Sequence, residues 1–185
     1  MRPVVKVLLV AAAIIAFGYI FIGNLGSQKI EFETNSAEIV PVGELTDGTE
    51  IIQSFSIGKS KTLSAVAIKL ATYIRVNEGK IIVSVRRSAH GDTIYSKSVD
   101  ASSIADNEYL VHRFPPIRFM KNDTYYLSIK SIGAGPGRAI TAYKTSDDAD
   151  PDGELWIDGI PQTGDLVIKT YTFEPWFARI FNLFT

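Results

Sequence analysis

The sequence predicts an all-β protein, a jelly-roll-type β-sandwich with one N-terminal transmembrane helix and a short C-terminal amphipathic helix. Three observations lead to this prediction. An uncharged apolar run lies near the N-terminus, apolar and polar residues alternate with period two from Ile30 to about Phe173, and turn-forming residues interrupt that alternation at short intervals. We therefore expect an anchor and linker over 1–29, a sandwich over 30–173 and a tail over 174–185.

The composition narrows the classes of protein. With 185 residues, of which 46% are hydrophobic and 21% charged, the chain is long and apolar enough to form one domain with a core. A net charge of -1 argues against nucleic-acid binding through a basic surface. The absence of cysteine excludes disulfides, cysteine-ligated metal centres and thiol catalysis.

The N-terminal apolar run extends from Val7 to Ile22 without a charge. As a helix it measures about 24 Å, and the aliphatic stem of Lys6 can extend it toward the roughly 30 Å of a bilayer core. We expect a retained anchor, because a signal peptide has a shorter apolar region of about 7–15 residues. Since Arg2 and Lys6 precede the run, the N-terminus is predicted in the cytoplasm and the sandwich in the periplasm.

The alternation is clearest from Leu63 to Val76. It predicts a long strand whose core face carries Val66, Ile68, Leu70, Thr72, Ile74 and Val76. The segment Asn77-Glu78-Gly79 then predicts a hairpin turn into a strand over Lys80–Arg87, because Gly79 tolerates a positive φ.

Further strands are predicted at intervals along the chain. Only Ala101–Asn107 suggests a helical turn, and Pro115-Pro116 is among the predicted strand breakers. The other predicted strands are Glu50–Ile57, Thr93–Val99, Tyr109–Phe114, Thr124–Ser131, Ala139–Lys144, Leu155–Ile157 and Asp165–Phe173.

The C-terminal tail has aromatic residues at helical spacing after Pro175, which can open a helix. Two interpretations remain: a tail that packs on the sandwich, and a helix that docks on a membrane surface or a partner protein. The second is favoured, and its apolar residues are Trp176, Phe177, Ile180, Phe181 and Phe184.

Catalysis has little support in the sequence. His90 falls in a predicted turn and His112 in a predicted strand, and neither belongs to a nucleophile, metal or phosphate motif. We expect each histidine to be either solvated or packed, and a protein that is not an enzyme.

An acidic segment follows residue 146. Asp148, Asp150, Asp152 and Gly153 match the first half of a calcium loop, and Asp158 adds another carboxylate. The match fails at the twelfth position, where Gly159 replaces the expected glutamate. Calcium is thus a possible cofactor, and the alternative is a solvated acidic loop.

A ligand or partner face is predicted from Tyr73, Arg75 and Asn77, which alternate on the non-core side of their strand, and from Trp156 beside the acidic loop. Aromatic and planar polar side chains suit sugars, and they suit protein interfaces equally well. A third interpretation is that Tyr73 and Arg75 simply cover other parts of the sandwich.

The order of several motifs resembles the galactose-binding-like jelly rolls, related to carbohydrate-binding modules, in extracytoplasmic parts of bacterial membrane proteins. The resemblance covers about residues 50–173 and implies the fold, whereas members of that family share no single ligand. The motifs are Gln53-Ser54-Phe55, Ala71-Thr72-Tyr73-Ile74-Arg75-Val76-Asn77-Glu78-Gly79, Phe114-Pro115-Pro116-Ile117, Tyr125-Tyr126-Leu127-Ser128-Ile129, Gly153-Glu154-Leu155-Trp156 and Gly164-Asp165-Leu166.

Two functions are consistent with these features. The favoured one is a non-catalytic, single-pass accessory subunit of the bacterial inner membrane, whose sandwich braces a larger complex, such as a photosynthetic or respiratory one. Its partners are the lipid bilayer and other subunits of that complex. The alternative is a membrane-anchored carbohydrate-binding module whose partner is an envelope glycan.

Overall fold

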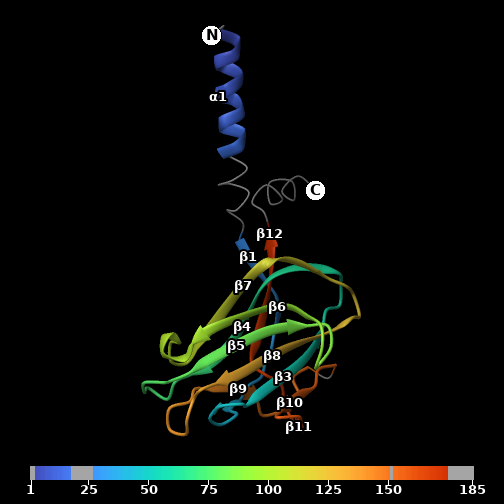
Figure 1. Cartoon of the computed structure of the whole chain (residues 1–185). Coiled ribbons are helices and arrows are strands. Elements are labelled where there is room, and N and C mark those ends of the chain that lie inside the picture. The colour runs from blue at the N-terminus through green and yellow to red at the C-terminus, as the bar shows by residue number, and fades with distance from the viewer. Residues whose placement is uncertain (1–2, 18–26, 151, 175–185) are drawn as a thin grey trace.

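The computed structural model describes residues 3–17, 27–150 and 152–174, and most of them form a sandwich of two antiparallel β-sheets (Figure 1). A helix α1 (Pro3–Phe17) precedes the sandwich, and a short 3-10 helix η2 (Ala101–Ser103) replaces the longer helical turn predicted there. The strands are β1 (Ser27–Glu33), β2 (Ile39–Pro41), β3 (Glu50–Ser56), β4 (Lys61–Ala71), β5 (Lys80–Arg86), β6 (Thr93–Asp100), β7 (Glu108–Phe119), β8 (Thr124–Ile132), β9 (Thr141–Thr145), β10 (Leu155–Ile157), β11 (Ile160–Gln162) and β12 (Ile168–Glu174).

The two sheets have distinct strand orders. The first runs β1-β12-β4-β9-β2, with β7 also paired to β4, and the second runs β11-β10-β3-β8-β5-β6. The predicted all-β sandwich is therefore confirmed. Ser27 pairs with Glu174, so the first and last strands of the sandwich are neighbours, and these two residues lie at the end of the sandwich that faces α1 (Figure 1).

The core lies between the sheets. Val66, Ile68 and Leu70 are buried in it, as the alternation along β4 predicts, and they face Val83 and Leu127 of the second sheet within one apolar cluster. An aromatic group of Phe55, Phe119 and Tyr125 extends this cluster, with ring centroids 4.3–6.2 Å apart.

Strand β7 is longer than predicted, because it continues through Pro115 and Pro116. Proline lacks an N–H group, so it is tolerated only where no ladder bond is required. Strand β7 pairs with β4 alone, and the register of that pairing shifts between Leu63 and Ala65, close to the two prolines.

Strand β4 is shorter than predicted and ends at Ala71. The predicted hairpin to β5 is also wrong, because β4 and β5 belong to different sheets and residues 72–79 cross between them. Gly79 does have a positive φ, of 81°, and a Cβ there would meet the Ile132 carbonyl oxygen at 2.3 Å. The turn residue was thus identified correctly, but the connection it makes was not.

The N-terminal helix carries no acidic residue, and Leu8, Ile14 and Ile15 on it are exposed. No helix within the described residues has the length and apolar character needed to span a membrane. Residues 18–22 of the predicted span, and the tail with Trp176, Phe177, Ile180, Phe181 and Phe184, lie outside the described residues.

Candidate functional site

The loop of residues 72–77 begins where β4 ends, and its backbone is unusual. Tyr73 and Ile74 both have a positive φ, of 57° and 55°. That conformation is unfavourable for a β-branched residue such as Ile74. The loop is held by Asp106, whose carboxylate accepts hydrogen bonds from the Thr72 N–H at 2.6 Å and the Thr72 hydroxyl at 2.9 Å. These bonds lower the pKa of Asp106.

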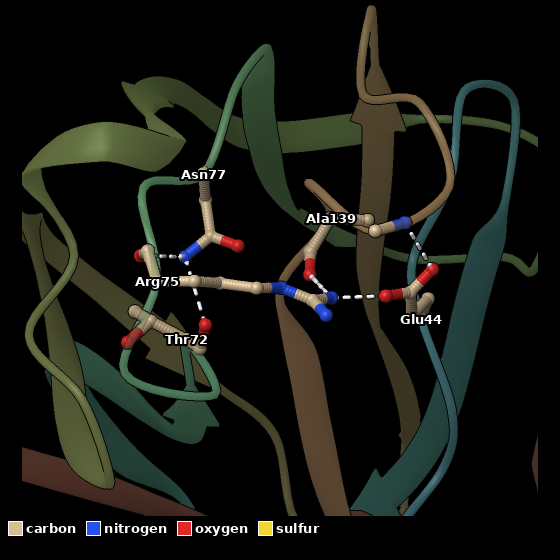
Figure 2. A network of polar contacts seen from close by, with 6 residues as sticks. Glu44, Thr72, Arg75, Asn77 and Ala139 are labelled. Atoms are coloured by element: carbon tan, nitrogen blue, oxygen red, sulfur yellow. Dashed lines mark hydrogen bonds and ion pairs between the residues drawn. The ribbon is translucent and has the colours of Figure 1, made fainter.

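Arg75 and Asn77 turn back into the protein instead of pointing toward solvent (Figure 2). The Arg75 guanidinium pairs with Glu44 and donates to the Ala139 carbonyl at 2.8 Å. The Asn77 amide donates to the carbonyl oxygens of Thr72 and Arg75 at 3.2 and 3.1 Å. The Gly137 N–H, followed by Arg75, lowers the pKa of Glu44.

The predicted ligand face of Tyr73, Arg75 and Asn77 is therefore not an open polar surface. Arg75 and Asn77 brace the loop, and the Arg75 guanidinium also lies 4.7 Å from the centre of the Tyr73 ring. The predicted core residues Ile74 and Val76 are instead 90% and 81% exposed, which corrects their assignment. The alternation failed here because the strand ends before these residues.

The backbone of the acidic loop is hydrogen-bonded to Asp165, a buried residue that is 2% exposed. One carboxylate oxygen of Asp165 accepts from the N–H groups of Ala149 and Asp150, each at 2.8 Å, and the other accepts from the Gln53 amide at 3.0 Å. Gly153 packs against the Gln53 and Asp165 side chains, so closely that a Cβ at position 153 would lie 2.9 Å from the Gln53 amide nitrogen. A side chain at position 153 would therefore displace the Gln53 amide from its present position.

The aspartates predicted to bind calcium do not form a single group. Asp158 lies in the turn between β10 and β11, and its carboxylate accepts a hydrogen bond from the Glu50 N–H of β3 at 2.8 Å. Burial and the neighbouring Asp165 raise the pKa of Asp150, and Asp148 and Asp152 are exposed. Within residues 3–17, 27–150 and 152–174, no three acidic or histidine side chains gather closely enough to hold a metal ion. The calcium site stays a prediction, without support from these contacts.

Beside the acidic loop lies an open hollow of about 490 Å³, which we call the Trp156 hollow. Its walls include Asp147, Asp148, Glu154, Trp156, Pro161 and Gln162. The Trp156 ring is half-buried on β10, and its centre lies 6.3 Å from that of Tyr126 on β8. The hollow therefore joins one aromatic wall to carboxylates and an amide that face solvent.

Sequence reasoning missed several residues that form this site. Gln53 and Asp165 were noted only as motif residues of the resemblance, and their contact joins positions 112 residues apart. Tyr126 supports Trp156 across the sheet, and Gln162 reaches the hollow from β11. A glycine before Asp165 was the available signal, since Gly164 has a φ of 79° and marks a tight turn.

The two histidines are placed as expected. His90 is exposed in the turn after β5, and His112 lies in the core opposite Val66, 1% exposed. Neither ring nitrogen of His112 has a hydrogen-bond partner among the described residues. Burial, followed by the charge of Lys97, lowers the pKa of His112 to about 4.

Comparison with known proteins gives a likeness of fold only. No family model and no curated protein matches the chain. One similar solved structure is "CBM32 of AlyQ in complex with 4,5-unsaturated mannuronic acid", with 15% identity and a TM-score of 0.36 over 60% of this chain and 93% of that chain. Another, "CBM4 structure and function", has 10% identity and a TM-score of 0.36 over 85% and 83%. Both are carbohydrate-binding modules by name, and neither likeness is strong enough to transfer a ligand.

Proposed function

We propose that this protein is a non-catalytic binding module that takes a neutral carbohydrate in the Trp156 hollow. The observation that carries the proposal is the combination of Trp156 with Asp148, Glu154 and Gln162 around one open hollow. An aromatic ring can pack against the apolar face of a sugar, while carboxylate and amide oxygens accept hydrogen bonds from its hydroxyl groups. Since the hollow's walls carry acids and no lysine or arginine, they favour an uncharged ligand over an acidic one.

The site is built to keep its shape without ligand. Asp165 and Gln53 fix the acidic loop from below, and Ser54 accepts from the Glu154 N–H at 2.8 Å. A wall held in place loses little conformational entropy when a ligand binds. The exposed carboxylates of Asp148 and Glu154 can therefore contact the ligand, because buried groups already support the backbone.

The test compares two aromatic residues, the half-buried Trp156 and the exposed Tyr73. Trp156→Ala should abolish binding to neutral oligosaccharides, first found on a glycan array and then measured by calorimetry. Tyr73→Ala is the matched control, because it removes an aromatic ring from the braced loop and should leave binding unchanged. Unaltered binding by the Trp156 variant would exclude this site.

Fluorescence offers a second measurement, because the chain has two tryptophans, Trp156 and Trp176. In a Trp176→Phe background the emission reports Trp156 alone. Sugar binding should then change the emission of the folded protein. If a sugar binds with no change in this signal, its site lies elsewhere on the molecule.

A second candidate function rests on helix α1. We infer that this helix attaches the protein to a bacterial inner membrane, with the sandwich in the periplasm as an accessory part of a larger complex. The support is the apolar surface of α1, where Leu8, Ile14 and Ile15 are 63–71% exposed. External protease should then digest a C-terminal tag in spheroplasts, and the protein should co-purify with other membrane subunits in mild detergent. Protection of the tag, or purification of the protein alone, would contradict this function.

A further inference from the structure

A second open hollow, of about 460 Å³, lies on the outer face of the first sheet. We call it the Tyr109 hollow, and it plays no part in the function proposed above. Glu33, Thr34, Asn35, Ser36, Lys69 and Tyr109 are among the residues that line it. Its chemistry differs from that of the Trp156 hollow, because an ammonium group lies in its wall.

The pairing register of β4 and β7 brings the side chains of Lys69 and Tyr109 together. Lys69 on β4 pairs directly with Tyr109 on β7, and both lie on the face opposite the core residues Ile68 and Leu70. The Lys69 ammonium is 5.4 Å from the centre of the Tyr109 ring. One side of the hollow therefore offers a cation and a phenol next to each other.

A second lysine, from β12, also reaches this ring. Lys169 on β12 pairs with Ala67, whose small side chain leaves room for the lysine to extend across β4. The Lys169 ammonium lies 4.4 Å from the centre of the Tyr109 ring and 2.7 Å from the Glu33 carboxylate. Its charge is thus neutralised locally by Glu33.

The charge of Lys69 has no such compensation. Its ammonium donates to the Asn107 carbonyl at 2.7 Å, and it forms no ion pair with any carboxylate in the described parts of the chain. An ammonium group has three N–H donors, so two are left for a ligand. The Tyr109 hydroxyl is protonated at neutral pH, since burial raises its pKa further above its ordinary value, and it can therefore donate a hydrogen bond to a ligand.

We propose that the Tyr109 hollow is a second binding site, which takes the carboxylate group of an acidic sugar on Lys69 and Tyr109. The sugar class rests on the function proposed for the Trp156 hollow, whereas the preference for a carboxylate rests on Lys69. Asn35 and Ser36 at the rim supply groups that can bind sugar hydroxyls. The two hollows thus differ in ligand charge: neutral beside Trp156 and acidic beside Tyr109.

The test uses the full chain in a detergent with a zwitterionic, sugar-free head group, so that detergent does not compete for a glycan site. Saturation-transfer NMR measures the binding of glucuronate, glucose and acetate. Glucuronate should bind best, and its affinity should fall as salt rises from about 0.1 M to about 1 M, where the Debye length shortens from about 10 Å to about 3 Å. Equal binding of glucose would overturn the carboxylate assignment, and equal binding of acetate would overturn the sugar assignment.

Variants locate the site. Lys69→Gln should weaken glucuronate binding about tenfold or more, and Tyr109→Phe should weaken it by a smaller factor while keeping the ring. Lys121→Gln, at an exposed lysine in the turn before β8, is the matched control and should change nothing. Glucuronate binding that is unchanged in both Lys69→Gln and Tyr109→Phe would exclude the Tyr109 hollow. If Lys69→Gln does not fold, Tyr109→Phe decides alone.

The proposals for the Trp156 hollow and the Tyr109 hollow can be tested independently of each other. Trp156→Ala should leave glucuronate binding intact, and Lys69→Gln should leave binding of a neutral oligosaccharide intact. Loss of glucuronate binding in Trp156→Ala would mean that the acidic sugar occupies the Trp156 hollow, which contradicts the second site without removing the first.

Discussion

The braced loop of residues 72–77 and the acidic loop of residues 146–154 use their polar side chains in opposite ways. In the braced loop, Arg75 and Asn77 turn inward and hold the backbone, and apolar side chains are left outside. In the acidic loop, Asp165 holds the backbone from another segment. Most of the loop's own acidic residues are exposed, and only Asp150 is partly buried. A loop that is supported from outside itself can offer its polar groups to a ligand.

The two loops also differ in the direction in which the pKa values of their carboxyl groups are shifted. Glu44 and Asp106, which brace the first loop, have lowered pKa values because they accept hydrogen bonds from backbone or cationic groups. Asp150 in the acidic loop has a raised pKa because burial and Asp165 disfavour its charge. Acid therefore removes stabilising charges from the braced loop and relieves repulsion in the acidic loop.

The largest effect is expected from Asp165→Ala. It leaves the N–H groups of Ala149 and Asp150 and the Gln53 amide without their acceptor, which should reduce the free energy of unfolding by about 4 kcal/mol. Urea unfolding measures the loss, and binding at the Trp156 hollow should disappear with it. The control is Asp148→Ala, an exposed neighbour whose removal should change stability by less than about 0.5 kcal/mol. Equal effects of the two variants would refute the support assigned to Asp165.

The core also contributes to the pH dependence of stability, and its contribution must be known before the two loops can be compared by pH. His112 is neutral in the folded protein down to about pH 4, whereas in the unfolded chain it binds a proton near its ordinary value of 6.5. Stability should therefore be complete above pH 6.5 and fall by about 3 kcal/mol as the pH decreases to 4. Urea unfolding at a series of pH values measures this slope, and His112→Leu should flatten it. A slope that persists in the variant would assign the effect to other groups.

A smaller loss is expected when the braced loop loses its internal support. Asn77→Ala removes two hydrogen bonds from a buried amide, and should cost about 2 kcal/mol of stability. Because the acidic loop does not depend on Asn77, sugar binding at the Trp156 hollow should not change. Calorimetry with the variant checks this, and a parallel loss of binding would show that the two loops are coupled.

The strained backbone gives a prediction of opposite sign. Ile74→Gly should raise the free energy of unfolding by about 0.5–1 kcal/mol, because glycine adopts the positive φ of 55° without a steric penalty. Val76→Gly is the control, since Val76 is also exposed but has no positive φ, and there glycine should destabilise. A loss of stability in Ile74→Gly would mean that the side chain contributes more than its exposure indicates.

The smallest effect is expected at Asp150. Asp150→Asn removes a charge that Asp165 opposes, and should stabilise the protein at neutral pH by a few tenths of a kcal/mol. The gain should vanish at acid pH, where the wild-type carboxyl is already protonated. Differential scanning calorimetry at the two pH values detects it. A destabilised variant at neutral pH would show that the negative charge of Asp150 is useful, as a cation site would require.

The sequence predicted the parts of the fold that depend on local pattern. The period-two alternation along β4 correctly placed Val66, Ile68 and Leu70 in the core. It did not reveal where β4 ends, because Thr72 stops the strand through a bond to Asp106, which lies 34 residues away. The ligand role of Trp156 is predicted from its residue type and its place beside the acidic segment. The support that Gln53 and Asp165 give was not predicted, because it depends on a contact between segments 112 residues apart.

The pairing of β1 with β12 has a mechanical consequence. Because Ser27 lies opposite Glu174, a force that pulls the two flanks of the sandwich apart opens this antiparallel ladder one hydrogen-bonded pair after another. Strands β10 and β11, which form part of the Trp156 hollow, lie at the far end of the sandwich (Figure 1). When a ligand in the Trp156 hollow is pulled away from the N-terminal end of the sandwich, the force acts along the strands. It is then shared by many hydrogen bonds between strands at once. The sandwich should therefore resist traction by its ligand better than separation of its own ends.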